Sequence, residues 1–211
     1  RWLDAPDPLV MQRAVNLLAA LGATEADGSL TDVGRRMTAF PLPPRLARLM
    51  AAGQDEQCVV ELAAIAALMQ GEGVAMKGGL NDNLRDSADY TDFQAEWRAV
   101  EKAVDAGFEA GACTRWGISA RGAREVWMAY RQLLSIGSRG KSREMPEPDF
   151  TAARPAVVRA MMESFADHVG VRNGVAANTC RMAGGVGGRL AEGSVAFHGE
   201  HFVAAEVAEL S

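Results

Sequence analysis

Apolar residues in the first part of the chain recur at the spacing of an α-helix. A helix is predicted from Pro8 to Leu21, and Gly22 is expected to end it because glycine readily adopts the conformation of a helix end. Its apolar residues are Leu9, Val10, Ala14, Leu17, Leu18 and Leu21. The segment CVVELAAIAALM, which begins at Cys58, is apolar nearly all round. This pattern predicts a helix in the middle of a bundle, and Asp55 is expected to cap it.

The segment between these two helices has the parts of a winged helix. The Asp-Gly pair within ATEADGSLT is a tight-turn signal between two brief extended arms. Thr31 is a good N-cap for a short helix that ends near Phe40, where PLPP breaks it. Another helix is predicted from Arg45 to Ala52. Helix, helix and a small hairpin together predict a winged-helix unit over residues 1–53.

Three later segments predict the remaining helices. A helical stripe runs from Phe93 to Phe108, Ser119 starts an amphipathic helix that contains Trp127, and a last helix is predicted from about Ala152 to Phe165 with Pro155 in its first turn. The segment from Gly71 to Ala88 is rich in Gly, Asn and Asp. It is expected to be a loop that is mobile or ordered by a partner.

The pattern changes beyond Gly170, where short Val- and Ala-rich runs alternate with AGGVGGR and FHGE and end in FVAAEVAEL. These runs predict about three strands, whereas an OB-fold needs about five. The predicted fold class is therefore mainly α with a small β part. A winged helix (1–53) is followed by a helical bundle (54–145), then by a linker helix and a partial OB-like β-unit (146–211).

Composition agrees with closely packed helices. The chain has 211 residues, of which 48% are hydrophobic and only 6% aromatic, and alanine is abundant. Its three cysteines lie far apart, and their odd number argues against a disulfide framework, which favours the cytoplasm. No apolar run approaches the roughly 20 residues of a membrane span, so no membrane partner is predicted. The first residue is Arg1 rather than methionine, and we expect a piece of a longer protein.

Charge is unevenly distributed along the chain. The net charge is −5, with −8 in residues 54–110 and +5 in residues 111–145. A polyanion would therefore meet residues 111–145 first. Six basic residues there are candidate phosphate contacts, and a solvated helix face with internal ion pairs is the alternative. They are Arg121, Arg124, Arg131, Arg139, Lys141 and Arg143.

The stretch SIGSRGKS, residues 135–142, has part of the pattern of a phosphate-binding loop. A P-loop needs a glycine where this chain has Ser135, and it opens a helix after a strand. Here the stretch follows a predicted helix and precedes the linker EMPEPD. The sequence therefore favours a basic helix end and a connector, with no nucleotide site.

Other candidate chemistry is weak. His198 and His201 are three residues apart, but no cysteine lies at finger spacing from them, so no structural metal is predicted. The glycines of AGGVGGR do not fit a dinucleotide fingerprint and are expected to serve turns. No Ser or Cys nucleophile is paired with a base, so the sequence predicts no catalytic residue and no bound cofactor.

Several segments together carry a family resemblance. LLAALGATEADGSLTDVGRRM and FPLPPRLARLM share the signature Leu-Gly-Ala, an acidic-Gly turn, Leu-Thr-x-x-Gly-Arg-x-Met and Pro-Leu-x-Pro-Arg-Leu-Ala-Arg. Cys113, Ile118, Arg121 and Gln132-Leu133 keep the spacing of a ratchet-like helical domain, and SFADHVGVR resembles the start of an OB-like domain. In this order the segments resemble the region that follows the two motor lobes of DEAH-box RNA helicases, most nearly the HrpB-like branch.

The resemblance implies an accessory part of an ATP-dependent helicase. ATP and Mg are expected in motor lobes outside this sequence, which contains no Asp-Glu-x-His. The implied partners are single-stranded RNA or another nucleic acid and the motor lobes of the same parent chain. Four arginines are candidates for the motor-lobe interface, or for pairing with nearby Asp or Glu: Arg35, Arg36, Arg45 and Arg48. A rival hypothesis is a protein-interaction module that does not bind RNA.

Overall fold

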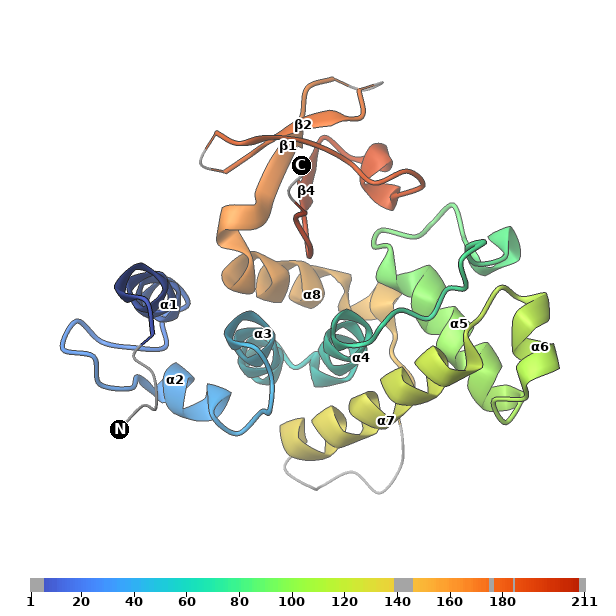
Figure 1. The fold of residues 1–211 in the computed structure, drawn as a ribbon, viewed down its shortest axis with the longest axis horizontal. Helices are drawn as coiled ribbons and strands as arrows, with labels where there is room; N and C mark the ends of the chain where they lie inside the picture. Colours follow the sequence, from blue (N-terminus) through green and yellow to red (C-terminus); the bar gives the residue numbers. More distant parts are fainter. Residues whose placement is uncertain (1–5, 139–145, 175–176, 184, 209–211) are drawn as a thin grey trace.

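The computed structural model describes residues 6–138, 146–174, 177–183 and 185–208. These residues form a mainly helical body with a small antiparallel sheet standing on one side of it (Figure 1), which confirms the predicted fold class. The helices are α1 (Pro8–Ala20), α2 (Asp32–Met37), α3 (Pro44–Asp55), α4 (Val59–Gln70), α5 (Phe93–Asp105), α6 (Ala110–Arg115), α7 (Ala120–Gly137) and α8 (Phe150–Ser164). Short 3-10 turns are η1 (Asp82–Leu84), η2 (Ala166–His168) and η3 (Val195–His198).

Polar caps fix several of the helix starts. The Thr31 hydroxyl accepts from the Gly34 amide at the start of α2, as the sequence predicts. The predicted helix start at Ser119 is also confirmed, and the Ser119 hydroxyl accepts from the Gly122 amide there. The prediction for Asp55 is wrong. Asp55 is the last residue of α3, and its carboxylate accepts from Arg36 at 2.7 and 2.8 Å, which draws it away from α4.

The hairpin predicted between α1 and α2 is reduced to a single antiparallel bridge. Thr24 pairs with Leu30, and the Thr31 amide donates to the Ala23 carbonyl at 3.1 Å. This arm lies so close to α2 that a Cβ on Gly34 would stand 2.0 Å from the Ala23 carbonyl oxygen. Gly34 in the Leu-Thr-x-x-Gly-Arg signature is thus the residue that allows α2 to touch the arm.

The bundle is built around α4, as its all-round apolar pattern predicts. Its buried residues include Leu62, Ile65 and four alanines, and α3, α5, α7 and α8 pack against it. Small side chains let neighbouring helices approach closely. One contiguous hydrophobic cluster extends from Leu21 to Phe165. Residue 53, the predicted end of the winged helix, lies inside α3, while the domain boundaries themselves stay a prediction.

The segment 71–88 differs from the predicted mobile loop. The Met76 amide donates to the Gly117 carbonyl at 2.8 Å, and the Ser119 amide donates to the Val74 carbonyl at 2.8 Å. Val74 and Leu84 are buried. Backbone hydrogen bonds and apolar anchors therefore hold this segment against the start of α7. Helix α6, between α5 and α7, was not predicted.

The sheet has the strand order β3-β2-β1-β4, with every neighbouring pair antiparallel. Its strands are β1 (Val169–Arg172), β2 (Thr179–Met182), β3 (Gly187–Arg189) and β4 (His201–Val203). In the described residues it thus has one strand more than predicted, and β4 includes the first two residues of FVAAEVAEL. Helix α8 begins at Phe150, so Pro155 lies inside it and not in its first turn.

The carboxyl group of Glu96 on α5 gives a pH-dependent prediction. Burial, and then the nearby Asp92 charge, raise the pKa of Glu96 above its usual range, while Arg85 opposes the shift. A carboxyl whose pKa is higher in the folded state destabilises the fold once ionised, so its cost grows as pH rises from about 4 through the raised pKa. Glu96→Gln should therefore unfold at a higher temperature than the natural chain at pH 7. Thermal unfolding at about pH 4 should show the difference disappear; an equal difference at both pH values would contradict this account.

Candidate nucleic-acid and motor-lobe interfaces

The basic side of α7 is the first candidate interface. Arg121, Arg124 and Arg131 are exposed, and their spacing places them on one side of the helix. The Arg121 Nε donates to Glu125 Oε1 at 2.8 Å, and the Arg124 guanidinium lies 5.1 Å from the centre of the Phe108 ring. Arg131 makes no hydrogen bond or ion pair to any residue that the structure describes.

Acidic neighbours partly neutralise this side of α7. The hydrogen bond to Glu125 raises the pKa of Arg121, and the charges of Glu125 and Glu72 act in the same direction. Two of the three arginines thus have partners within the chain, and both interpretations made from the sequence keep support. The other three basic candidates, Arg139, Lys141 and Arg143, lie outside the described residues.

All four arginines predicted at a motor-lobe interface have acidic partners within the chain. Arg35 pairs with Asp32, and Arg36 with Asp55. Arg48 donates to Glu163 at 2.7 Å, and Arg45 forms a two-pronged pair with Asp167 at 2.7 and 2.6 Å. The last two pairs join residues more than 110 positions apart in sequence. No spacing rule could have named these partners.

Arg45 and Arg48 fasten α3 to the end of α8. Arg45 also donates to the Ser164 carbonyl at 3.2 Å, and its guanidinium lies 5.8 Å from the centre of the buried Phe165 ring. Arg48 donates from Nε to the Leu21 carbonyl at 3.1 Å. Two-pronged arginine–carboxylate pairs hold a defined geometry. These arginines therefore position the junction between the bundle and the sheet.

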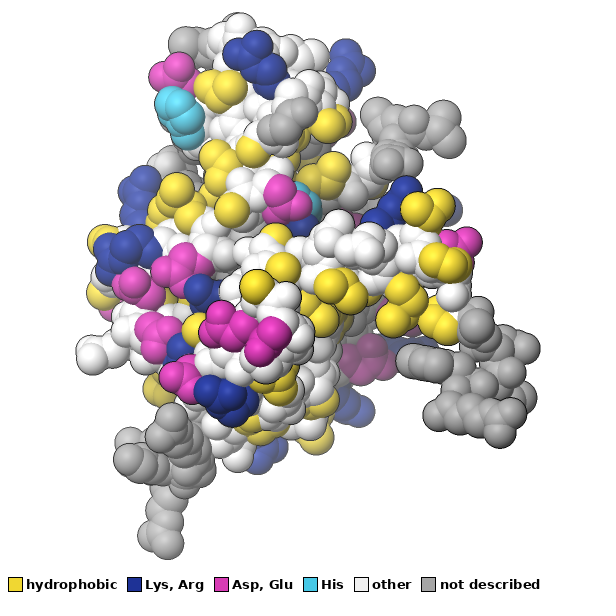
Figure 2. All heavy atoms as spheres, turned by 90° about the vertical axis from the view of Figure 1, so that its left-hand side faces the viewer, with side chains coloured by type: hydrophobic (Ala, Val, Ile, Leu, Met, Phe, Trp, Pro, Cys, Tyr) yellow, Lys and Arg dark blue, Asp and Glu magenta, His cyan; other side chains and the backbone are white. Residues whose placement is uncertain are grey.

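Helix α1 presents an apolar surface that the sequence did not assign to any interface. Every residue from 8 to 16 is exposed, and no residue of α1 is fully buried. Leu9 is 70% exposed and Val15 is 51% exposed, and only Leu17 and Leu18 pack partly on the core. Figure 2 shows hydrophobic side chains gathered along this helix. Periodicity predicts which residues share a face but not what covers that face, so the sequence carried no signal for this surface.

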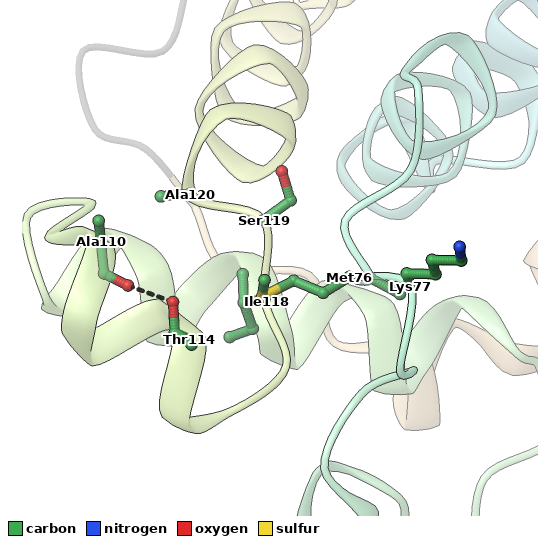
Figure 3. A pocket seen from close by; sticks show the side chains of 8 residues that line it. Met76, Lys77, Ala110, Thr114, Ile118, Ser119 and Ala120 are labelled. Carbon is green, nitrogen blue, oxygen red and sulfur yellow. Dashed lines mark hydrogen bonds between the residues drawn. The ribbon is translucent and has the colours of Figure 1, made fainter.

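A shallow cavity of about 370 Å³ lies where the 75–77 segment meets α6 and the start of α7. Met76 and Ile118 meet in it, whereas the amine of Lys77 points away (Figure 3). The Thr114 hydroxyl donates to the Ala110 carbonyl, and the Ser119 hydroxyl caps α7. Both hydroxyl groups in its lining are therefore already engaged, and the lining residues offer no arrangement of groups for catalysis.

The described residues offer no assembled chemistry elsewhere. All three cysteines are free and buried, and burial raises the pKa of Cys58 to about 12, so this thiol stays protonated at neutral pH. Within the described residues no group of three or more His, Cys, Asp or Glu side chains could hold a metal ion. Nor is any described helix both long and apolar enough to cross a membrane.

The first four residues of SIGSRGKS, 135–138, lie at the end of α7. Ser135 to Gly137 end α7 and Ser138 is its C-cap, so the stretch follows a helix as the sequence predicts. A P-loop would instead place its phosphate-binding amides at the start of a helix. The remaining residues of the stretch lie outside the described part of the chain.

Comparison with known proteins identifies relatives of this architecture. Residues 14–42 match the family model of the helicase associated domain (HA2), winged-helix. The mouse (Mus musculus) protein "ATP-dependent RNA helicase homolog DQX1" is 40% identical over 68 residues, which are 32% of this chain and 10% of that protein. Two structures of HrpB from Escherichia coli, described as a DExH-box NTPase and as a DEAH/RHA helicase, superpose with TM-scores of 0.64 and 0.60 at 21% and 20% identity.

The extent of these matches differs between the two kinds of relative. The HrpB structures match 100% and 99% of this chain, which spans 20% and 21% of theirs. The mouse relative matches a third of this chain, which spans a tenth of that protein. Sequence thus relates the winged-helix segment, and structure relates the whole chain. Residues 14–42 thus match a helicase-associated winged-helix model, and the chain as a whole has the fold that it shares with about a fifth of the HrpB structures.

Proposed function

We propose that this chain is the C-terminal accessory region of an ATP-dependent RNA helicase, which packs on the motor lobes and guides single-stranded nucleic acid. The sites for ATP and Mg would lie in those lobes. The observation that carries the proposal is the set of exposed apolar side chains of α1, a helix whose second half belongs to the segment that matches a helicase-associated winged helix. An accessory region needs a surface that binds the other domains of its parent protein.

The energetics of α1 support a covering partner. An isolated helix of its length is marginal in water, and most helical stability comes from packing an apolar face. Burying an exposed Leu or Val contributes roughly 1.5–3 kcal/mol. Leu9, Val10 and Val15 are all more than half exposed. We therefore propose that the motor lobes bind at α1. The four arginines that pair within the chain are not the proposed contact.

The proposed contact with nucleic acid is the basic side of α7. Arg131 is exposed and is not committed to an acid in the described chain, and Arg121 can exchange its exposed pair with Glu125 for a phosphate. Exposed ion pairs of this kind contribute at most about 1 kcal/mol, so exchange costs little. Arginine forms two-pronged hydrogen bonds to phosphate oxygens.

Binding to labelled single-stranded RNA across a salt series tests this contact. The natural chain should bind weakly, and Arg121→Ala with Arg131→Ala should reduce the slope of log affinity against log salt by about 1.4, since each lost phosphate contact on single strands removes about 0.7. The matched control is Arg35→Ala with Arg159→Ala, which removes two exposed charges elsewhere and should leave that slope nearly unchanged. Equal slopes for both double variants would remove the α7 arginines from the proposal.

The alternative function is a protein-interaction module that recruits or regulates a partner without RNA. The acidic neighbours of Arg121 and the exposed apolar side chains of α1 favour it. A partner that stays bound at high salt, together with no RNA shift at low salt, would support this alternative. Loss of that partner on Leu9→Asp with Val15→Asp would place it on α1.

A further inference from the structure

The sheet is attached to the helical body at two separate places. One is the chain connection from α8 through η2 into β1. The other is the loop after β3, which reaches the segment leading into α5 (Figure 1). These two attachments differ in burial and in chemistry.

The attachment beside η2 combines apolar packing with an ion pair, because η2 itself has no buried residue and its Asp167 pairs with Arg45. Phe165 is buried there beneath Arg45, and Val203 and Ala205 pack on the helical core. Val203 pairs with Val169 across the β1–β4 ladder, so these apolar contacts lie at the end of the sheet where the chain enters it. Burial of this kind is costly to undo.

The second attachment is polar and exposed. The Asp92 carboxylate accepts from the Ser194 hydroxyl and from the Val195 amide, each at 2.7 Å. Arg85 Nη1 donates to the Gly193 carbonyl at 2.7 Å. All three hydrogen bonds are exposed, so water can replace each partner. We call this set of bonds the 193–195 latch.

The position of Asp92 shows that its carboxylate serves the latch and not its own helix. Asp92 is the N-cap residue of α5, where an aspartate usually accepts from amides of the first turn. It forms no such capping bond, because both its oxygens face residues 194 and 195. Removal of this carboxylate should therefore loosen the loop without disturbing the start of α5.

We infer that the 193–195 latch is a releasable fastening that holds the sheet closed against the helical body, with residues 165–168 as the hinge on which it opens. The end beside η2 stays in place because opening there would expose Phe165 and break the pair between Arg45 and Asp167. The polar end opens first because it exchanges three exposed hydrogen bonds for water. Opening of the latch requires no bound nucleic acid, so it does not depend on the proposed function.

Hydrogen exchange and a spin-label distance test the latch in the whole chain. The variants Arg181→Cys and Ser135→Cys place labels on exposed positions of β2 and α7, while the three native cysteines are buried. Asp92→Ala should speed exchange of the Val195 amide roughly tenfold to one hundredfold, the change expected for losing a hydrogen bond to a charged group. It should also broaden the distance distribution toward longer values.

Three further variants make the result decisive. Asp92→Asn keeps a neutral acceptor for the Val195 amide and should fall between Asp92→Ala and the natural chain. Asp105→Ala removes an exposed carboxylate from the other end of α5 and should change neither measurement. Ser194→Ala removes one bond only and should give a smaller change in the same direction, and it decides the matter if Asp92→Ala does not fold. Faster exchange with an unchanged distance, or no change in either measurement, would overturn the latch.

Discussion

Arg98→Ala should destabilise the chain by about 3 kcal/mol, the low end of the cost of removing one partner from a buried ion pair, because Arg98 is itself 32% exposed. The Asp89 side chain is only 3% exposed and pairs with the Arg98 guanidinium. Arg98 Nη1 donates at 3.0 Å to Asp89 Oδ2 and at 2.9 Å to the Leu84 carbonyl. Without Arg98, a carboxylate stays buried with no cation, and the carbonyl loses its donor.

Urea unfolding followed by circular dichroism measures this loss. Arg35→Ala is the matched control, because Arg35 pairs with the exposed Asp32 and such surface pairs contribute at most about 1 kcal/mol. Adding Asp89→Ala to Arg98→Ala removes the stranded charge and should restore part of the stability. If Arg98→Ala costs no more than Arg35→Ala, the pair does not hold the 71–88 segment in the way described here.

Gly34→Ala should destabilise the winged-helix part by about 3 kcal/mol, the upper end for overpacking a tight site. The new methyl group would stand 2.0 Å from the Ala23 carbonyl oxygen, which is backbone and cannot rotate away as a side chain can. Either α2 or the 23–31 arm must move. Both movements strain the hydrogen bond from the Thr31 amide to the Ala23 carbonyl.

Gly78→Ala is the matched control for this substitution. A Cβ at Gly78 meets nothing within 4 Å, and its backbone has an ordinary φ. It should change stability by no more than about 0.5 kcal/mol, or raise it slightly by restricting the unfolded chain. Thermal unfolding of both variants gives the comparison. Equal midpoints would show that α2 and its arm have room to separate.

Local signals in the sequence predicted most of the helical fold. The all-round apolar segment from Val59 became the central helix, and the cap at Thr31 and the helix start at Ser119 lie where the sequence placed them. These predictions depend on neighbours within a few residues, which a sequence displays directly. Helix α6 was missed because six residues with a glycine among them give no periodic pattern.

Long-range pairing is what the sequence could not show. The Gly-rich segment 71–88 has the composition of a mobile loop, yet Asp89, Arg98 and the backbone of residues 116–119 hold it. Likewise, the four arginines that were candidates for the motor-lobe interface all pair with acidic residues within the chain. Two of these acidic partners lie more than 110 residues away in sequence. A sequence does not show which way a charged side chain points or which partner it meets. The candidate interface on α1 rests on the exposure of its apolar side chains, which only the structure shows.

Helix α3 has a mechanical consequence. It is tied to α2 through Asp55 near its last turn, and to α8 and the residues after it through Arg45 and Arg48 in its first turns. Between these ties its residues are buried against α4. A force applied to the winged helix would therefore rotate α3 as a rigid body. The pairs of Arg45 and Arg48 would transmit this rotation to residues 163–167, where the chain leads into the sheet.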